Sequence, residues 1–193
     1  MKSAISTKSA AIGAGLLLIA AVGATVAFNS TAASGAVVPK VVRPAVAIGK
    51  PSLYIKFDVI AGGSTAKAHK GASDATAFSG ALTSPVDGRT QFGDITVTKP
   101  IDIATPKILT AEAKGQAQKQ VDLYVEGTSA SGKSSTVTHI ILTTVFITSD
   151  QFISTTSGEV EKLTLNYQKI QYDRFNGSTP VSFKWDVAAN KGF

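Results

Sequence analysis

QVDLYVEGTSASGKSSTVTHIILTTVFIT, residues 120–148, says more about the fold than any other part of this sequence. Residues 120–126 alternate apolar and polar side chains, which is the period of a strand with one buried face. Of the fourteen residues 135–148, ten are Thr, Val or Ile, and these residue types are stiff at χ1 and favour strands. Small polar residues separate the two segments, so the stretch predicts a β-hairpin.

The loop of this hairpin, GTSASGKS at 127–134, matches the G-x-x-x-x-G-K-[ST] pattern of a nucleotide-binding P-loop. In such a site the loop enters a helix, whose N-terminal N–H groups bind the phosphates. Here a strand pattern follows Ser134. We therefore interpret the match as a hairpin tip and Lys133 as a solvated loop lysine, and we do not expect nucleotide binding.

The composition is that of one globular domain with a tail. The chain has 193 residues, 44% hydrophobic and 17% charged, and a formal net charge of +6. The basic residues form no dense cluster, so nucleic-acid binding is not expected. The chain contains no cysteine, and its two histidines, His69 and His139, are not at a zinc-binding spacing. Neither a metal nor a cofactor is expected.

Residues 1–33 are predicted to be a secretory signal peptide. Lys2 and Lys8 are the only charges before the apolar run AGLLLIAAVGATVAF at 14–28, and small residues follow it. Cleavage after Ala24, Ala27 or Ala33 fits equally well. If uncleaved, the run would anchor the chain in a membrane, since about 20 apolar residues span a bilayer. Its modest hydrophobicity favours cleavage, so we expect a secreted or periplasmic protein, with a membrane-anchored form as the alternative.

Residues 34–51, SGAVVPKVVRPAVAIGKP, are predicted to be an extended linker or arm, because three prolines interrupt any helix there. The valine-rich part at 37–48 could pair with the edge of a sheet, either in its own chain or in a neighbour.

Residues 52–193 are predicted to form a domain that is mainly β. Alternating patterns mark strands at 53–59, 93–99 and 181–187, and a weak strand is expected at 76–82 within a long loop at 61–84. The strand at 161–175 changes phase, which predicts a β-bulge near Gln168 or Lys169. In the last strand Trp185 shares a face with three other apolar residues, so it is expected in the core.

One short helix is expected at 107–114. Thr105 is predicted to cap it, Pro106 suits its first turn, and Gly115 can end it in a left-handed conformation.

An enzyme is not expected. There is no G-x-S-x-G motif between a strand and a helix. Five acidic residues fall on strand faces or turns, where solvated surface positions are the default: Asp122, Glu126, Glu159, Glu161 and Asp173.

Five segments, taken in order, resemble the Hcp family, the tube protein of type VI secretion systems. They are YIKFDVI at 54–60, HKG at 69–71, ITVTKPIDIATPKIL at 95–109, EKLTLNYQKIQYDRF at 161–175 and FKWDVAANK at 183–191. The resemblance implies a compact two-sheet β-barrel with one short α-helix on its side. It also implies that six copies close into a ring and that rings stack into a tube.

The resemblance further places His69, Lys70 and Gly71 in an extended loop used for contacts within rings and between them. The implied partners are other copies of the chain, with secretion-apparatus proteins or effectors beyond them. Two features differ from the family pattern: the signal peptide, and the loss of aromatic residues at Ala72 and in AFSGA at 77–81. The main interpretation is an exported, self-assembling structural protein. The alternative is a monomeric secreted binding module or effector with the same fold.

Overall fold

The structure is a computed structural model that describes residues 50–193 except 87, 129–131 and 157. The predicted signal peptide and nearly all of the predicted arm lie outside the described residues. Within the described part, no helix is long and apolar enough to cross a membrane.

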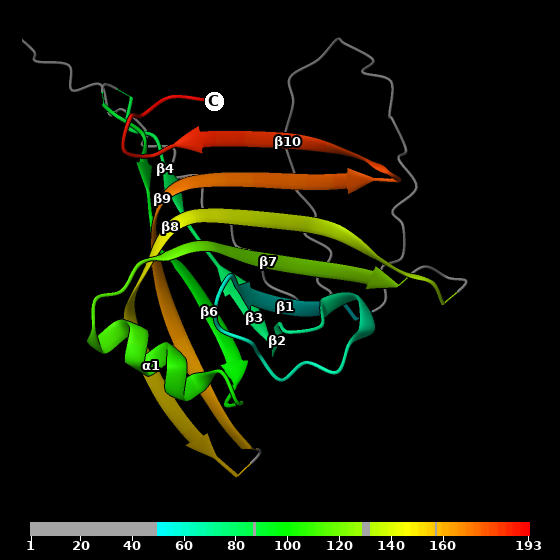
Figure 1. Cartoon of the computed structure of the whole chain (residues 1–193). Coiled ribbons are helices and arrows are strands. Elements are labelled where there is room, and N and C mark those ends of the chain that lie inside the picture. The colour runs from blue at the N-terminus through cyan, green and yellow to red at the C-terminus, as the bar shows by residue number, and fades with distance from the viewer. Residues whose placement is uncertain (1–49, 87, 129–131, 157) are drawn as a thin grey trace, which may run out of the picture.

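The described residues form ten strands, one α-helix and one turn of 3-10 helix (Figure 1). In chain order they are β1 Ser52–Phe57, the 3-10 turn η1 Lys67–His69, β2 Ser73–Ala75, β3 Ala77–Ser79, β4 Leu82–Thr83, β5 Gln91–Phe92, β6 Ile95–Pro100, α1 Thr105–Ala113, β7 Gln118–Thr128, β8 Ser134–Thr155, β9 Gly158–Asn176 and β10 Thr179–Asp186.

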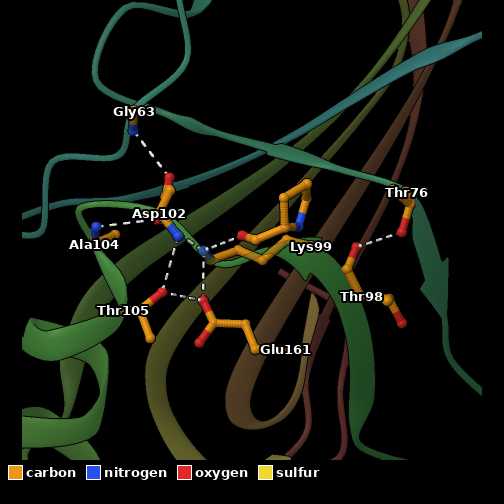
Figure 2. Close-up of polar contacts among 9 residues, drawn as sticks. Gly63, Thr76, Thr98, Lys99, Asp102, Ala104, Thr105 and Glu161 are labelled. Carbon is orange, nitrogen blue, oxygen red and sulfur yellow. Dashed lines mark hydrogen bonds and ion pairs between the residues drawn. The ribbon is translucent and has the colours of Figure 1, made fainter. Parts of the chain in front are cut away.

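Eight of the strands form one curled antiparallel sheet in the order β2-β1-β7-β8-β9-β6-β3, with β10 also paired to β9. The two ends of this order, β2 and β3, are consecutive parts of one segment, residues 73–79, so the sheet closes into a barrel. The change of partner occurs at Thr76. Its backbone N–H and its hydroxyl donate to the Thr98 carbonyl at 2.8 and 3.1 Å, and Figure 2 shows the hydroxyl bond. The expected mainly β barrel with one helix is confirmed.

The barrel core is aliphatic. Alternate residues along the strands of the barrel wall, such as β1 and β6, point inward, and Ile55, Leu123, Leu142, Leu163 and Leu165 are fully buried. Each such side chain stabilises the fold by about 1.5–3 kcal/mol relative to an exposed position. Helix α1 packs outside the barrel against β8.

The predicted hairpin is confirmed. Strands β7 and β8 pair over residues 118–128 and 134–145, with Leu123 opposite Ile140. Because β8 begins at Ser134, no helix N-terminus faces the GTSASGKS loop, as the strand pattern indicated. The structure does not describe the tip, residues 129–131.

The long loop expected at 61–84 contains more strand than predicted. Besides η1 it holds β2, β3 and β4, of which β3 and the first residue of β4 fall in the predicted range 76–82. The small residues of this segment hid the alternation, because Ala, Ser and Gly carry little hydrophobic signal.

The bulge predicted near Gln168 or Lys169 is wrong. In that region β9 pairs with β8 in unbroken register, and the only register shift between the two strands lies between Ile147 and Ser149. The phase change is real, but β8 makes the same change: its buried residues step from Leu142 to Val145, while the inward side of β9 steps from the buried Tyr167 to the partly buried Ile170. Both strands therefore turn together, and Thr144 adopts a left-handed φ of 52° at this corner.

The N-cap prediction for α1 is also wrong. Thr105 is the first helical residue and Ala104 stands at the N-cap, without a side-chain cap. The Asp102 carboxylate takes the capping role, because it accepts a hydrogen bond from the Ala104 N–H at 3.0 Å. The C-terminal prediction is confirmed, since Gly115 has a φ of +58°.

Trp185 is half-buried and not a core residue, contrary to the prediction. The predicted shared face exists, but it belongs to β10, which lies at an edge of the sheet and is poorly covered. Val181 is 75% exposed and Phe183 is 42% exposed. Trp185 stacks at its rim with Phe92 and Phe183, at centroid distances of 6.0 and 6.1 Å. The pattern predicted a common face correctly, but it did not show how little of the barrel covers that face.

Candidate assembly surface

The loop from Asp58 to Ala72 leaves the end of β1 and folds back over the outer face of the sheet. Backbone hydrogen bonds hold it in a closed shape: the Gly62 N–H donates to Gly71 O at 2.9 Å and the Ser64 N–H donates to Ala72 O at 2.8 Å. A side chain on Gly62 would overlap the backbone of Ala72 and Ser73. This close crossing requires glycine, so the loop has a defined conformation.

His69, predicted to belong to a contact loop, is buried within the subunit. Its Nε2 lies 3.0 Å from Glu126 Oε1. Its ring stacks on Tyr54 at 4.2 Å and lies against Tyr124 at 4.6 Å. The histidine therefore anchors the loop to β1 and β7.

Lys70 and Gly71 lie differently. Lys70 is exposed, as are Lys67 and Ala68 in the turn before it. Gly71 has a φ of +80°, and a Cβ there would meet no other atom. Glycine is favoured at this position by the left-handed backbone conformation and not by a lack of space. The structure thus separates the HKG stretch into a buried anchor, an exposed cation and a turn residue.

His139 continues the stack beyond Tyr124. The two rings are 4.3 Å apart and nearly parallel, and His139 Nε2 lies 2.8 Å from Asp122 Oδ1. Both histidines of the chain therefore pack against one tyrosine, and each pairs with a carboxylate of β7. The sequence did not predict this stack of four rings, from Tyr54 through His69 and Tyr124 to His139, because cross-strand neighbours are set by strand register and not by spacing along the chain.

Beneath the loop lies a buried ion network, shown in Figure 2. Lys99 and Glu161 are both fully buried and form an ion pair. The Lys99 ammonium also donates to Asp102 Oδ1 at 2.8 Å and to Pro100 O at 2.9 Å, and the Thr105 hydroxyl donates to Glu161 Oε1 at 2.8 Å. Glu161, Glu126 and Asp173 are buried, so the expectation that these acids are solvated is wrong.

Asp102 connects three parts of the fold. Its Oδ2 accepts the Gly63 N–H of the loop at 2.9 Å, while its Oδ1 accepts from Lys99 and from the helix start at Ala104. Burial alone would raise the pKa of Asp102, but the hydrogen bonds from Lys99 and Gly63 outweigh it and hold the pKa below its usual value. The lysine and aspartate of the segment at 95–109 thus join the barrel, the helix and the loop.

Asp150 on β8 adds a second carboxyl group beside Glu161. Both Asp150 oxygens and Glu161 Oε2 are buried without another hydrogen-bond partner among the described residues. Burial first, and then the negative charge of Glu161, raise the pKa of Asp150 to about 7. A proton held between the two carboxyl groups would satisfy one oxygen of each.

A second surface feature is an open apolar groove at the end of the barrel, with a volume of about 280 Å³. Its walls come from β3 to β5 on one side and from β9 and β10 on the other, and include Phe78, Leu82, Phe92, Tyr172 and Phe183. The outer edge of β10 is also unpaired in the described residues, except for one bridge between Asp186 and Lys191. The unpaired edge of β10 and the apolar groove therefore form a surface that the described residues leave uncovered.

The described residues hold no group of three or more His, Asp or Glu side chains placed to bind a metal.

The comparison with protein families matches residues 54–173 to the family described as Type VI secretion system effector, Hcp. The search of curated proteins found no match.

Solved structures with a similar fold include Hcp1 from Salmonella typhimurium, at 15% identity and a TM-score of 0.67, covering 74% of this chain and 99% of the other. A type VI secretion system effector from Yersinia pestis matches at 22% identity and a TM-score of 0.62, covering 70% and 99%. Secreted protein Hcp3 from Pseudomonas aeruginosa matches at 17% identity and a TM-score of 0.59, covering 70% and 96%.

Proposed function

Since this chain belongs to the Hcp family of type VI secretion proteins, we propose that it is a structural subunit that assembles into hexameric rings. Members of the family form such rings, which stack into tubes for type VI secretion. The observation that carries the proposal is the family match over residues 54–173, which includes the loop, the ion network and most of each barrel strand except β10. The role is structural, and no catalytic step belongs to it.

The open edge of β10 supports ring formation. An exposed strand edge carries unpaired N–H and C=O groups and tends to pair with another chain. In a head-to-tail arrangement the open edge of each subunit is covered by the next subunit. Such an arrangement closes into a ring when a whole number of identical rotations between subunits makes a full turn. The neighbouring subunit would contact this edge.

The loop over the outer face is the second proposed contact. Lys67, Ala68 and Lys70 would form the contact surface, because they are exposed on a backbone that internal hydrogen bonds already fix. His69 would hold this surface in place through Glu126. Pre-ordering lowers the entropy cost of assembly, since the loop need not become ordered when subunits meet.

Export belongs to the proposal as well. Hcp proteins are secreted type VI components, and we infer that the N-terminal signal sends this chain out of the cytoplasm to a secreted or periplasmic location. The partners would then be other copies of the chain, and secretion-apparatus proteins or effectors that reach the same compartment.

The test is the mass and shape of the exported chain, by light scattering after size exclusion and by negative-stain imaging. We expect a species of six subunits and ring-shaped particles. Lys70→Glu should shift the mass towards the monomer, whereas Lys107→Glu, an equal charge change at an exposed position of α1, should not. A monomer at high concentration would contradict the proposal and favour the binding module or effector.

A further inference from the structure

One end of the barrel is incompletely covered. Val181 and Phe183 are both exposed large apolar residues of β10, and Phe183 also lines the open groove. Trp185 continues the same face and stacks on Phe183. Contiguous apolar surface of this kind on a soluble protein usually marks a contact with another segment or molecule.

The described chain begins beside this end of the sheet. Strand pairing connects Leu53 to Val125, Val125 to Thr138, Thr138 to Arg174, and Arg174 to Val181. Leu53 and Val181 therefore lie in one row across the sheet, four strand spacings or about 19 Å apart. The residues that precede β1 enter it at the same end of the sheet at which Val181 is exposed.

The sequence before β1 suits this surface. Residues 37–48 read VVPKVVRPAVAI, in which eight of twelve residues are Val, Ala or Ile. Pro39 and Pro44 disfavour a helix and favour extended backbone around them. Twelve extended residues reach about 40 Å, which is enough to cross four strands and return along the groove.

We propose that residues 37–48 lie across the open end of the barrel of their own chain and cover Val181 and Phe183. The tether at Lys50 favours the same chain over a neighbour, because a short linker keeps the segment at a millimolar effective concentration. Extended backbone points Lys40 and Arg43 to opposite faces, and whichever one faces the barrel would lay its alkyl stem along the apolar surface and keep its charged end in solvent. The inference does not depend on ring formation, and each of the three expected cleavage points leaves the segment in place.

Disulfide trapping tests the proposal directly, because the chain has no cysteine of its own. In the exported protein, Val37→Cys, Val41→Cys or Val46→Cys is combined with Val181→Cys and mildly oxidised. At least one pair should form a disulfide within one chain, seen as a faster band on a non-reducing gel. The matched control replaces Val181→Cys by Ser182→Cys, the exposed next residue, whose side chain points to the opposite face.

Three results would overturn the proposal: no disulfide with Val181→Cys, equal yields with Ser182→Cys, or disulfides formed only between chains. The last would show that a neighbour's segment fills the groove.

The single tryptophan gives an independent readout, since Trp185 lies on the face that the segment would cover. Val41→Asp with Val46→Asp in the exported chain should release the segment, shift Trp185 emission to longer wavelength and increase its quenching by acrylamide. Lys40→Gln with Arg43→Gln should leave both nearly unchanged, because it removes only the charged ends, which lie in solvent, and keeps most of the alkyl stems. Unchanged emission and quenching in the valine variant would contradict the proposal.

Discussion

At the scale of single residues, Lys99 has the largest predicted effect on stability. Lys99→Met would leave Glu161 fully buried without its cation and would remove a hydrogen bond from Asp102. Breaking a buried ion pair on one side costs about 3–5 kcal/mol, so urea unfolding should show a loss of that size. Lys107→Met, an exposed position of α1, should change the free energy of unfolding by less than about 0.5 kcal/mol. Equal losses in the two variants would contradict the role assigned to Lys99.

Asp150 should make stability depend on pH. Because its pKa is raised to about 7 from 3.8, the folded chain holds this proton more tightly than the unfolded chain does. The resulting stabilisation is complete below about pH 4 and is lost as the pH rises through about 7. Asp150→Asn should therefore gain stability relative to the parent between pH 4.5 and pH 8, measured by urea unfolding at both values.

Asp58→Asn, a change at an exposed carboxylate, serves as the control for that experiment and should show no such relative gain. A constant difference between Asp150→Asn and the parent across this range would mean that Asp150 is not held protonated in the folded state.

At the scale of elements, the closed loop depends on the crossing at Gly62. Gly62→Ala should open the loop, because the added methyl group overlaps the backbone of Ala72 and Ser73. We expect faster tryptic cleavage after Lys67 and Lys70, with far-ultraviolet circular dichroism of the barrel little changed. Gly63→Ala is the control, since a Cβ there meets Asp102 at an ordinary 3.5 Å. Equal cleavage rates in both variants would contradict this view of the loop.

The corner of β8 and β9 contains a β-branched residue in a left-handed conformation, Thr144. Thr144→Gly should stabilise the fold: left-handed backbone costs a non-glycine residue about 1–2 kcal/mol, while the greater freedom of glycine when unfolded costs about 0.5–1 kcal/mol. Thr143→Gly, in ordinary strand backbone next to it, should destabilise. A higher melting temperature for Thr144→Gly together with a lower one for Thr143→Gly would support the left-handed conformation of Thr144. A lower melting temperature in both variants would contradict it.

At the scale of the whole molecule, the proposed export implies that the signal segment is removed from the chain. We predict that intact-mass measurement of the chain recovered outside the cytoplasm will show an N-terminus directly after Ala24, Ala27 or Ala33. Replacing Leu16, Leu17 and Leu18 by Asn should keep the full-length chain in the cytoplasm, because it removes the apolar centre of the signal. An exported chain that still begins at Met1 would favour the membrane anchor.

Much of the fold could be predicted because its signals are local. The strand patterns, the hairpin around residues 127–134 and the helix end at Gly115 each depend on residues within a few positions of one another. Trp185 shows the limit. Alternation shows which side chains share a face, but burial depends on which distant segments cover it, and β5 covers only part of that face.

The candidate site was less predictable than the fold. Lys99 pairs with Glu161 and His69 with Glu126, partners that lie about sixty residues apart and meet only because the barrel closes. Local reasoning assigns such acids to the surface, where most carboxylates lie. Thr105 has the same explanation, since a distant carboxylate engages its hydroxyl and Asp102 is near enough to replace it as the cap.

The closure of the barrel at Thr76 bears on how a tube of such subunits would respond to mechanical force. The segment 73–79 joins β1 by three residue pairs and β6 by three more, whereas β8 and β9 share sixteen. Under a pulling force the long β8–β9 pair is therefore the strongest part of the sheet, and the short pairings of β2 with β1 and of β3 with β6 are the weakest. The short pairings of β2 and β3 should break first and at low force, while β8 and β9 stay paired. The barrel of the subunit would then open before the rest of the fold is lost.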